Sequence, residues 1–299
     1  MEIRQLEYFV AVADELSFSR GAARVHVVQS AISTAIAKLE RELGIELFDR
    51  SRLRITLTGA GTAFLAEARG TLNAARRARD SVAQFHGQLS GTVDIGILQS
   101  SGPIDLPAVL GRFHRKHPLV SVRLRQSTGG SAGHLAAIAD GSLELALVAL
   151  TDKPPNGVTM QALTSEPLFF LCRPDHPLAE REHIAVTDLA AETFVCFTAG
   201  WGIRRLTDRA FEDAGLNPAS PYEVCDYATA AGLVRHRLGT TLLPATEAVQ
   251  FSDLCAIPLA PALVWNLLLA TPPPQQLSAA ARAMTQALLQ HARQTNETP

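Results

Sequence analysis

Residues 29–50 read QSAISTAIAKLERELGIELFDR, and this stretch decides the fold of the first part of the chain. Its apolar residues Ile32, Ile36 and Leu39 recur at helical spacing, while its first turns carry short polar side chains. Gly44 predicts the end of the helix, because glycine readily adopts the left-handed conformation that follows a helix. The stretch therefore predicts an amphipathic helix whose N-terminal half is polar on its exposed side.

Two shorter helices and a basic hairpin flank this helix. Residues 6–13 carry an apolar face at helical spacing, and Ser17 or Ser19 is suited to cap a short second helix. The connection between the second and third helices is very short, which is typical of a helix-turn-helix. Residues 45–57 alternate loosely between apolar residues and arginines. They predict two short strands, and so an all-α winged helix-turn-helix with a basic wing.

A long helix follows from Thr58 to the region of Gly87 or Gly91. Residues 58–90 contain no proline. About 30 residues without a break favour a coiled-coil-like linker helix over an element of a globular core. Its apolar residues follow 3-4 spacing, and we expect Leu65, Leu72 and Val82 to contribute to dimerisation.

The rest of the chain alternates strands and helices. Strands are predicted at 92–98, 121–126 and 143–150, with helices between them, and this order favours a parallel sheet covered on both faces. A second run of strands follows near 167–173, 193–197, 222–226 and 240–243, with helices near 202–214 and 228–238. A last strand at 265–271 and an amphipathic helix at 278–293 complete an α/β fold.

Composition excludes several classes of protein. The chain has 299 residues, of which 47% are hydrophobic, too many for a disordered protein. Residues 1–90 contain 12 Lys and Arg against 10 Asp and Glu, an excess too small to identify a nucleic-acid binder. The start of the chain lacks the pattern of a secretory signal, and no apolar run approaches the roughly 18 residues of a membrane span. We therefore expect a cytoplasmic protein with no membrane partner.

Chemistry-bearing motifs are equally sparse. The sequence contains no G-x-S-x-G, H-E-x-x-H or P-loop motif, and no G-x-G-x-x-G after a strand. His114 and His117 lie among basic residues at a predicted helix end, where a solvated face is a simpler explanation than a metal site. The four cysteines are widely spaced and should be free thiols in a reducing compartment. We expect no enzyme activity, no cofactor and no metal.

The N-terminal residues resemble the signature of LysR-type transcriptional regulators. The resemblance is carried by Gln29, Ser33, the run from Leu39 to Arg50, and Leu57-Thr58-x-Ala60-Gly61. It implies a winged helix-turn-helix over residues 1–58, a linker helix over 59–90 and an effector-binding domain over 91–299. That domain is expected to be two-lobed and similar to periplasmic binding proteins. Lobe I would comprise about 91–161 and 267–299, and lobe II about 162–266.

The resemblance places the third helix in the major groove of double-stranded DNA. Short polar side chains near its start can reach base edges, and arginines of the wing can contact phosphate or the minor groove. The expected DNA-binding residues are Gln29, Ser30, Ser33, Thr34, Lys38, Arg50, Arg52 and Arg54. The family usually has a capping serine where this chain has Val28, so Ser30 becomes the candidate cap.

Polar segments follow several predicted strands, where ligands bind in open α/β sheets. The candidate effector-binding residues are Ser100, Ser101, Thr128, Gly129, Thr198, Trp201, Gly202 and Thr229. Each hydroxyl also has a structural interpretation as a helix cap, and Trp201 also has one as lobe packing. Helix N-termini and hydroxyls suit an anion, so the expected effector is a small organic acid, with Trp201 as an apolar wall.

The predicted function is regulation of transcription. The protein would bind paired half-sites as a homodimer or homotetramer, with its output altered by the effector. Two rival functions are a solute-binding module that never contacts DNA and an enzyme on the same two-lobed fold. A rival mechanism is oxidant sensing by Cys196 and Cys225, both of which lie in predicted strands.

Overall fold

The computed structural model describes residues 1–50, 55–83, 89–149 and 154–297. The chain separates into two compact units. One comprises Met1–Gly87 together with Asp140–Ser142, and the other comprises Gln88–Ala139 and Leu143–Pro299. Each unit has a hydrophobic core of its own.

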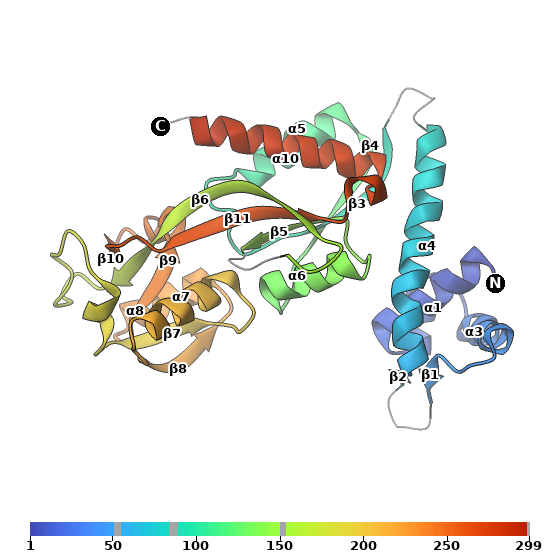
Figure 1. The fold of residues 1–299 in the computed structure, drawn as a ribbon, viewed down its shortest axis with the longest axis horizontal. Helices are drawn as coiled ribbons and strands as arrows, with labels where there is room; N and C mark the ends of the chain where they lie inside the picture. The colour runs from blue at the N-terminus through green and yellow to red at the C-terminus, as the bar shows by residue number, and fades with distance from the viewer. Residues whose placement is uncertain (51–54, 84–88, 150–153, 298–299) are drawn as a thin grey trace. The chain divides into compact units, whose positions relative to one another are not determined.

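The first unit contains three helices, a two-stranded wing and a long fourth helix (Figure 1). Its elements are α1 (Ile3–Glu15), α2 (Phe18–Arg24), α3 (Gln29–Leu43), β1 (Phe48–Asp49), β2 (Thr56–Leu57) and α4 (Gly59–Ala83). Ser17 caps α2, and Gly44 ends α3 with a φ of 71°. Before α4, the Thr58 hydroxyl accepts a hydrogen bond of 2.9 Å from the backbone N–H of Gly61. The predicted winged helix-turn-helix and long helix are confirmed.

Aromatic rings join the wing and the long helix to α1. The ring of Phe9 on α1 lies 5.3 Å from that of Phe48 in the wing and 5.1 Å from that of Phe64 on α4. Phe18 at the start of α2 lies 5.5 Å from Phe48. Phe9 and Phe48 are almost completely buried. Buried aromatic pairs add to the burial of apolar area, so this cluster fixes the wing and α4 on the three-helix core.

α3 begins at Gln29, before the position at which a helix capped by Ser30 would begin. Val28 occupies the N-cap position of α3, and no side chain caps the helix there. Ser30 lies inside the first helical turn. The expectation that Ser30 caps the helix is therefore wrong, because the backbone turns into the helix at Gln29 without a side-chain acceptor.

The second unit is built on a mixed sheet of seven strands with the order β10-β6-β11-β5-β3-β4, in which β9 also pairs with β6. Its strands are β3 (Ser90–Gly96), β4 (Leu119–Arg125), β5 (Leu145–Ala149), β6 (Thr159–Cys172), β9 (Thr241–Pro244), β10 (Cys255–Pro258) and β11 (Val264–Thr271). A separate parallel pair contains β7 (Thr193–Phe197) and β8 (Ala219–Val224). The helices are α5 (Leu106–Lys116), α6 (Gly130–Ala139), α7 (Gly202–Asp213), α8 (Tyr227–Arg235), α9 (Ala245–Ala248) and α10 (Ala279–Glu297).

The sheet is only partly parallel. β3 pairs in parallel with β4 and β5, as the alternation of strands and helices predicts. β11, β6, β9 and β10 pair antiparallel. The first half of β6 and all of β10 were not predicted as strands. An antiparallel strand needs no crossover helix beside it, so the pattern of alternation contains no trace of these pairings.

Helices cover both faces of the sheet in the first lobe. α5 and α10 lie on one face and α6 on the other (Figure 1). Accordingly β5 is buried on both faces. Leu145 and Leu147 belong to the larger core, while Ala146 and Val148 belong to the cluster under α6. A strand buried on both sides is typically a continuous apolar run, and residues 145–149 of β5 are all apolar.

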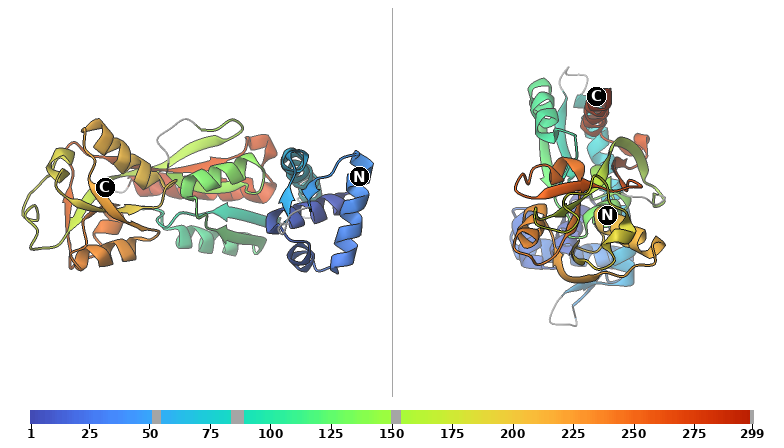
Figure 2. Two further views of the ribbon diagram at one scale, coloured as in Figure 1. Left: turned by 90° about the horizontal axis from the view of Figure 1, so that it is seen from below. Right: turned by 90° about the vertical axis from the view of Figure 1, so that its left-hand side faces the viewer.

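Two long strands extend through both lobes. β6 and β11 lie side by side from Val264 opposite Pro167 to Thr271 opposite Thr159, and they run from the first lobe into the second (Figure 1; Figure 2). The expected lobe boundaries at residues 161 and 266 fall inside these strands. In the described part of the chain, no helix combines the length and the apolar character needed to span a bilayer.

Candidate functional sites

The exposed side of α3 carries the short polar residues expected to read DNA. Gln29, Ser30 and Thr34 are exposed and Ser33 is half-buried, whereas Ile32 on the opposite side is completely buried. The first turn contains no acidic residue. An uncharged, short-chained surface on a helix is compatible with close approach to base edges in a major groove.

A hydrogen bond from α2 restrains the first residue of this helix. The Ser19 hydroxyl donates to the side-chain oxygen of Gln29 at 2.8 Å. This bond holds the Gln29 side chain close to the start of the helix, and the amide oxygen keeps a second lone pair.

Two of the basic residues predicted to contact DNA, Lys38 and Arg50, form ion pairs within the protein. Lys38 lies 3.2 Å from Glu2 and 3.9 Å from Glu42. Arg50 lies 2.7 Å from Glu40, and its guanidinium carbon lies 4.9 Å from the centre of the Phe18 ring.

Glu40 also accepts backbone hydrogen bonds from Leu47 and Phe48, so its contact with Arg50 anchors the wing to α3. The other two predicted wing arginines, Arg52 and Arg54, lie outside the described residues.

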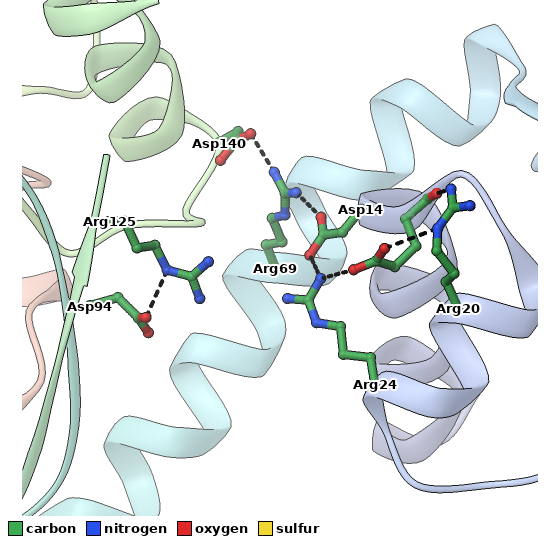
Figure 3. A network of polar contacts seen from close by, with 8 residues as sticks. Asp14, Arg20, Arg24, Arg69, Asp94, Arg125 and Asp140 are labelled. Carbon is green, nitrogen blue, oxygen red and sulfur yellow. Dashed lines mark hydrogen bonds and ion pairs between the residues drawn. The ribbon is translucent and has the colours of Figure 1, made fainter. Parts of the chain in front are cut away.

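An ion-pair network attaches α4 to the helix-turn-helix (Figure 3). The carboxylate of Asp14 on α1 contacts Arg69 on α4 and, at 2.8 Å, Arg24 on α2. Arg69 is only 12% exposed. The interaction of one carboxylate with two guanidiniums is stronger than a single exposed ion pair. The network therefore fixes the direction in which α4 leaves the helix-turn-helix.

The residues predicted for dimerisation lie along α4. Leu65 and Leu72 are half-buried and pack against the core of their own unit. The side chain of Val82 lies outside the described part of the chain. Part of each leucine therefore remains accessible to a partner, and part already contributes to the fold.

A cavity lies between the lobes of the second unit, at the carboxyl ends of β3, β4 and β5. It is lined by Ile97, Leu98, Gln99, Gln126, Ser127, Gly130, Ser131, Ala149, Trp201, Gly202, Ile203, Tyr227 and Trp265. None of these lining residues, all from the described part of the chain, is charged. The open space is about 30 Å³, room for about two water molecules. The structure therefore shows a small, narrow cavity.

Close backbone contacts keep the cavity small. A β-carbon on Gly130 would lie 2.8 Å from Cδ1 of Trp201, and one on Gly202 would collide with the carbonyl oxygen of Ala149. The indole of Trp201 is parallel to the ring of Phe197 at 5.8 Å and perpendicular to that of Tyr227 at 6.5 Å. Trp201 thus lines the cavity and packs the lobe at once, so the two interpretations of this residue are compatible.

The structure brings only part of the predicted effector site to this cavity. Trp201 and Gly202 line it. Six predicted residues are not part of the lining, namely Ser100, Ser101, Thr128, Gly129, Thr198 and Thr229.

Local hydrogen bonds account for three of these hydroxyls. Ser100 accepts from the backbone of Gly102, Ser101 donates to the carbonyl of Ile104, and Thr198 donates to that of Val224. Thr128 and Thr229 are exposed. The hydroxyls of Ser100, Ser101 and Thr198 are therefore explained by hydrogen bonds within local turns and not by a place in the cavity.

Several lining residues escaped the sequence analysis. Gln99, Ser127 and Ser131 lie one or two residues from predicted positions, so the segments were predicted correctly and the individual residues were not. Tyr227 precedes the predicted Thr229 on α8. Trp265 reaches the cavity only through the antiparallel pairing of β11, and no local pattern in the sequence could have indicated it.

Glu166 is a further residue that the sequence analysis did not predict. It stands opposite Trp265 on the neighbouring strand and is 6% exposed. Its Oε2 accepts a hydrogen bond of 2.7 Å from the backbone of Thr246, while its Oε1 has no partner among the described residues. Burial, with a smaller contribution from the charge of Glu247, raises the pKa of the Glu166 carboxyl.

The cysteines proposed for oxidant sensing do not face each other. In the parallel pair β7–β8, Cys196 is opposite Glu223, and Cys225 lies beyond the paired residues. Cys172 and Cys255 instead stand directly opposite on β6 and β10. Burial, then the neighbouring Cys255 and Glu192, raises the pKa of the Cys172 thiol to about 12. A thiol with so high a pKa is a poor nucleophile at neutral pH.

Comparison with known proteins identifies both units. Residues 3–62 match the family described as bacterial regulatory helix-turn-helix protein, lysR family, and residues 86–293 match the LysR substrate binding domain. The chain belongs to the LysR family of transcriptional regulators. LysR regulators bind DNA through the helix-turn-helix and carry an effector-binding domain, so the predicted family, fold and regulatory role are confirmed.

Relatives cover almost the whole chain. YybE, an uncharacterized HTH-type transcriptional regulator of Bacillus subtilis (strain 168), is 33% identical over 257 residues, which are 86% of this chain and 87% of YybE. A full-length OxyR variant from Pseudomonas aeruginosa superposes with a TM-score of 0.77 at 24% identity, covering 98% of this chain and 95% of OxyR. Full-length CbnR in complex with its target DNA superposes with a TM-score of 0.63 at 22% identity, covering 99% and 100%. At these identities the two structures show the shared fold.

The buried carboxyl of this LysR regulator predicts a pH dependence of stability. Because burial favours the neutral form of Glu166, the folded chain binds this proton more tightly than the unfolded chain does. The contribution of Glu166 to stability therefore falls as the pH rises from its ordinary pKa of 4.5 towards the raised value. Glu166→Gln removes this titration, so the melting temperature of the variant should rise relative to wild type across that window.

Thermal unfolding at several pH values between pH 4.5 and neutrality measures this difference. Glu180→Gln, at an exposed glutamate, is the matched control and should follow wild type at every pH. If the Glu166→Gln and wild-type curves run parallel, the carboxyl is not buried in the folded protein.

Proposed function

We propose that this LysR regulator reads paired operator half-sites through the first turns of α3. Residues 1–58 would form the DNA-binding domain, 59–90 the linker and 91–299 the effector domain. The proposal is supported by the uncharged polar surface of Gln29, Ser30, Ser33 and Thr34, which lies opposite the buried face of the helix. In a major groove, Gln29 suits an adenine and the hydroxyls suit several base edges.

The basic residues have a secondary role in this proposal. Lys38 is paired with Glu2 and Glu42, and Arg50 is paired with Glu40. Each can contact a phosphate only if it leaves its carboxylate partner or shares it. Arg52 and Arg54 of the wing are proposed to contact the DNA backbone or the minor groove. Such contacts position a protein on DNA and carry little sequence information.

A carboxylate at the centre of this surface should abolish specific binding. Ser33→Glu places a negative charge against the phosphate-lined groove, and circular dichroism checks that the variant is folded. We expect a loss of at least tenfold in affinity for the upstream region of the protein's own gene, measured by gel shift at fixed salt. Ser220→Glu, at an exposed serine of β8, is the control and should bind as wild type. Equal affinity of all three proteins would remove α3 from the interface.

We also propose that the protein acts as an oligomer paired along α4, as a homodimer or a tetramer of two dimers. Reading two half-sites requires two recognition helices at fixed separation. Asp14, Arg24 and Arg69 fix α4 to the helix-turn-helix, so a pair of α4 helices would set that separation. The accessible parts of Leu65 and Leu72, with Val82, would form the seam.

Opposite faces of α4 provide the test of this seam. Leu72→Asp would leave an unpaired carboxylate between two helices and should shift the protein to smaller species in analytical ultracentrifugation. Ala74→Asp lies two residues along, on the exposed opposite side of the helix, and should leave the oligomer intact. Circular dichroism checks that both variants are folded. Dissociation by Ala74→Asp alone would place the seam on the other face.

We further propose that the effector is a small organic acid held in the inter-lobe cavity. The first residues of α6, Gly130 and Ser131, and of α7, Gly202 and Ile203, all line it. Two helix N-termini supply backbone N–H groups and favourable dipoles for a carboxylate. Trp201, Tyr227 and Trp265 offer aromatic faces for a ring.

The small size of the cavity imposes a condition on binding. Typical ligand sites have volumes of about 300–1,000 Å³, and the space here is about 30 Å³. An organic acid must therefore bind a more open arrangement of the lobes. The ligand shifts the equilibrium between two arrangements only to the extent that its affinity for them differs. In this proposal, that shift is the way in which ligand binding affects the DNA-binding unit.

A substitution at the narrowest contact tests where the effector binds, and a comparison of acids with their uncharged amides tests whether it binds as an anion. Gly202→Ala puts a methyl group against the carbonyl of Ala149, so the two segments must move apart and the affinity for the effector should change at least tenfold. Gly232→Ala, where a β-carbon meets open space, is the control. Thermal-shift screening with carboxylic acids, each paired with its uncharged amide, followed by calorimetry, measures both effects. Stabilisation by amides as strong as by acids would refute the anion, and equal affinity in Gly202→Ala would refute the site.

A further inference from the structure

An exposed valine stands at the start of the recognition helix. Val28 is 68% exposed, more than any other large apolar residue in the described part of the chain. It occupies the N-cap of α3 with an extended backbone, φ −76° and ψ 148°, and makes no side-chain hydrogen bond. It is thus an apolar side chain in water next to the residues that the proposed function places on DNA.

The free protein gains little from a valine at this position. A serine or threonine at an N-cap accepts a hydrogen bond from the first turn, and valine is among the least favourable caps. Burial does not compensate, because most of the side chain remains accessible. The isolated fold therefore gives no reason for an apolar residue here, whereas an occupied groove would.

The neighbouring side chain, that of Gln29, is restrained at the same edge of the helix. Ser19 holds the amide of Gln29 by its 2.8 Å hydrogen bond. Gln29 and Val28 therefore present an amide and a branched aliphatic group side by side at the N-terminal edge of α3. An A·T pair displays in the major groove the acceptor and donor of adenine, which suit glutamine, and the C5 methyl of thymine, which suits an apolar side chain.

We infer that Val28 is a specificity residue that contacts a thymine methyl group in the major groove. The inference rests on the proposed function of α3 and adds a contact that a capping serine at this position cannot make. It makes one thymine at the edge of each half-site a preferred base. Burying one methyl group between valine and thymine should improve affinity about fourfold.

Uracil substitution isolates this contact. Full-length protein first selects duplexes from a library of random sequences, and the selected duplexes define its preferred site. Each thymine of that site is then replaced in turn by deoxyuridine, which lacks only the methyl group. For wild type, one thymine per half-site should lose about fourfold in affinity. The Val28→Ser variant should no longer lose affinity when uracil replaces that thymine, and it should respond as wild type does to uracil at every other position.

Two controls separate recognition from folding. Val249→Ser makes the same substitution at a 63% exposed valine in the second unit and should show the wild-type uracil pattern. Val28→Ser introduces a favourable cap, so its melting temperature should equal or exceed that of wild type.

The outcomes are distinguishable. Failure of the library to yield any preferred sequence would overturn the proposed DNA-reading function, and the inference with it. A preferred site that is insensitive to uracil, or a sensitivity that survives in Val28→Ser, would overturn the inference alone.

Discussion

The pairing of β6 with β11 is the constraint on which the regulatory unit depends. Both strands continue from one lobe into the other, and eight residue pairs from Val264–Pro167 to Thr271–Thr159 hold them together, with one irregularity between Leu267 and Leu268. Two hydrogen-bonded strands can bend and twist but cannot separate without exposing backbone groups. Any relative motion of the lobes must therefore keep this ladder intact, and the segments beside it form the walls of the cavity.

The walls of the narrow cavity are held together by close contacts between the segments that line it. Trp201 packs against Gly130, Phe197 and Tyr227, and Gly202 packs against Ala149. In the proposed effector mechanism, opening these contacts costs free energy, so the observed affinity would equal the intrinsic affinity reduced by the population of the open arrangement. A substitution at these contacts can therefore change effector response without touching the effector.

The sequence predicts those parts of the structure that local rules determine. Ser17, Gly44 and Thr58 mark helix ends through capping chemistry that involves only neighbouring residues. Segments that line the cavity were found because polar residues follow strands. The individual residues were not, because the hydroxyls of Ser100, Ser101 and Thr198 bond within their own turns. Trp265 and Glu166 come together by strand register, a long-range property. Similarly, only the folded chain shows that Glu40 engages Arg50.

The engagement of basic side chains determines how the first unit can achieve specificity. Arg24 and Arg69 pair with Asp14, Arg50 with Glu40, and Lys38 with Glu2. Ion pairs of this kind cancel part of the field that would attract DNA regardless of sequence. Discrimination then depends on short-range contacts of α3 with base edges, each of which contributes modestly. Modest contacts reach useful affinity when two half-sites are bound together at a fixed separation. In the proposed mode of DNA binding, the attachment of α4 through Arg69 therefore contributes to reading DNA together with α3.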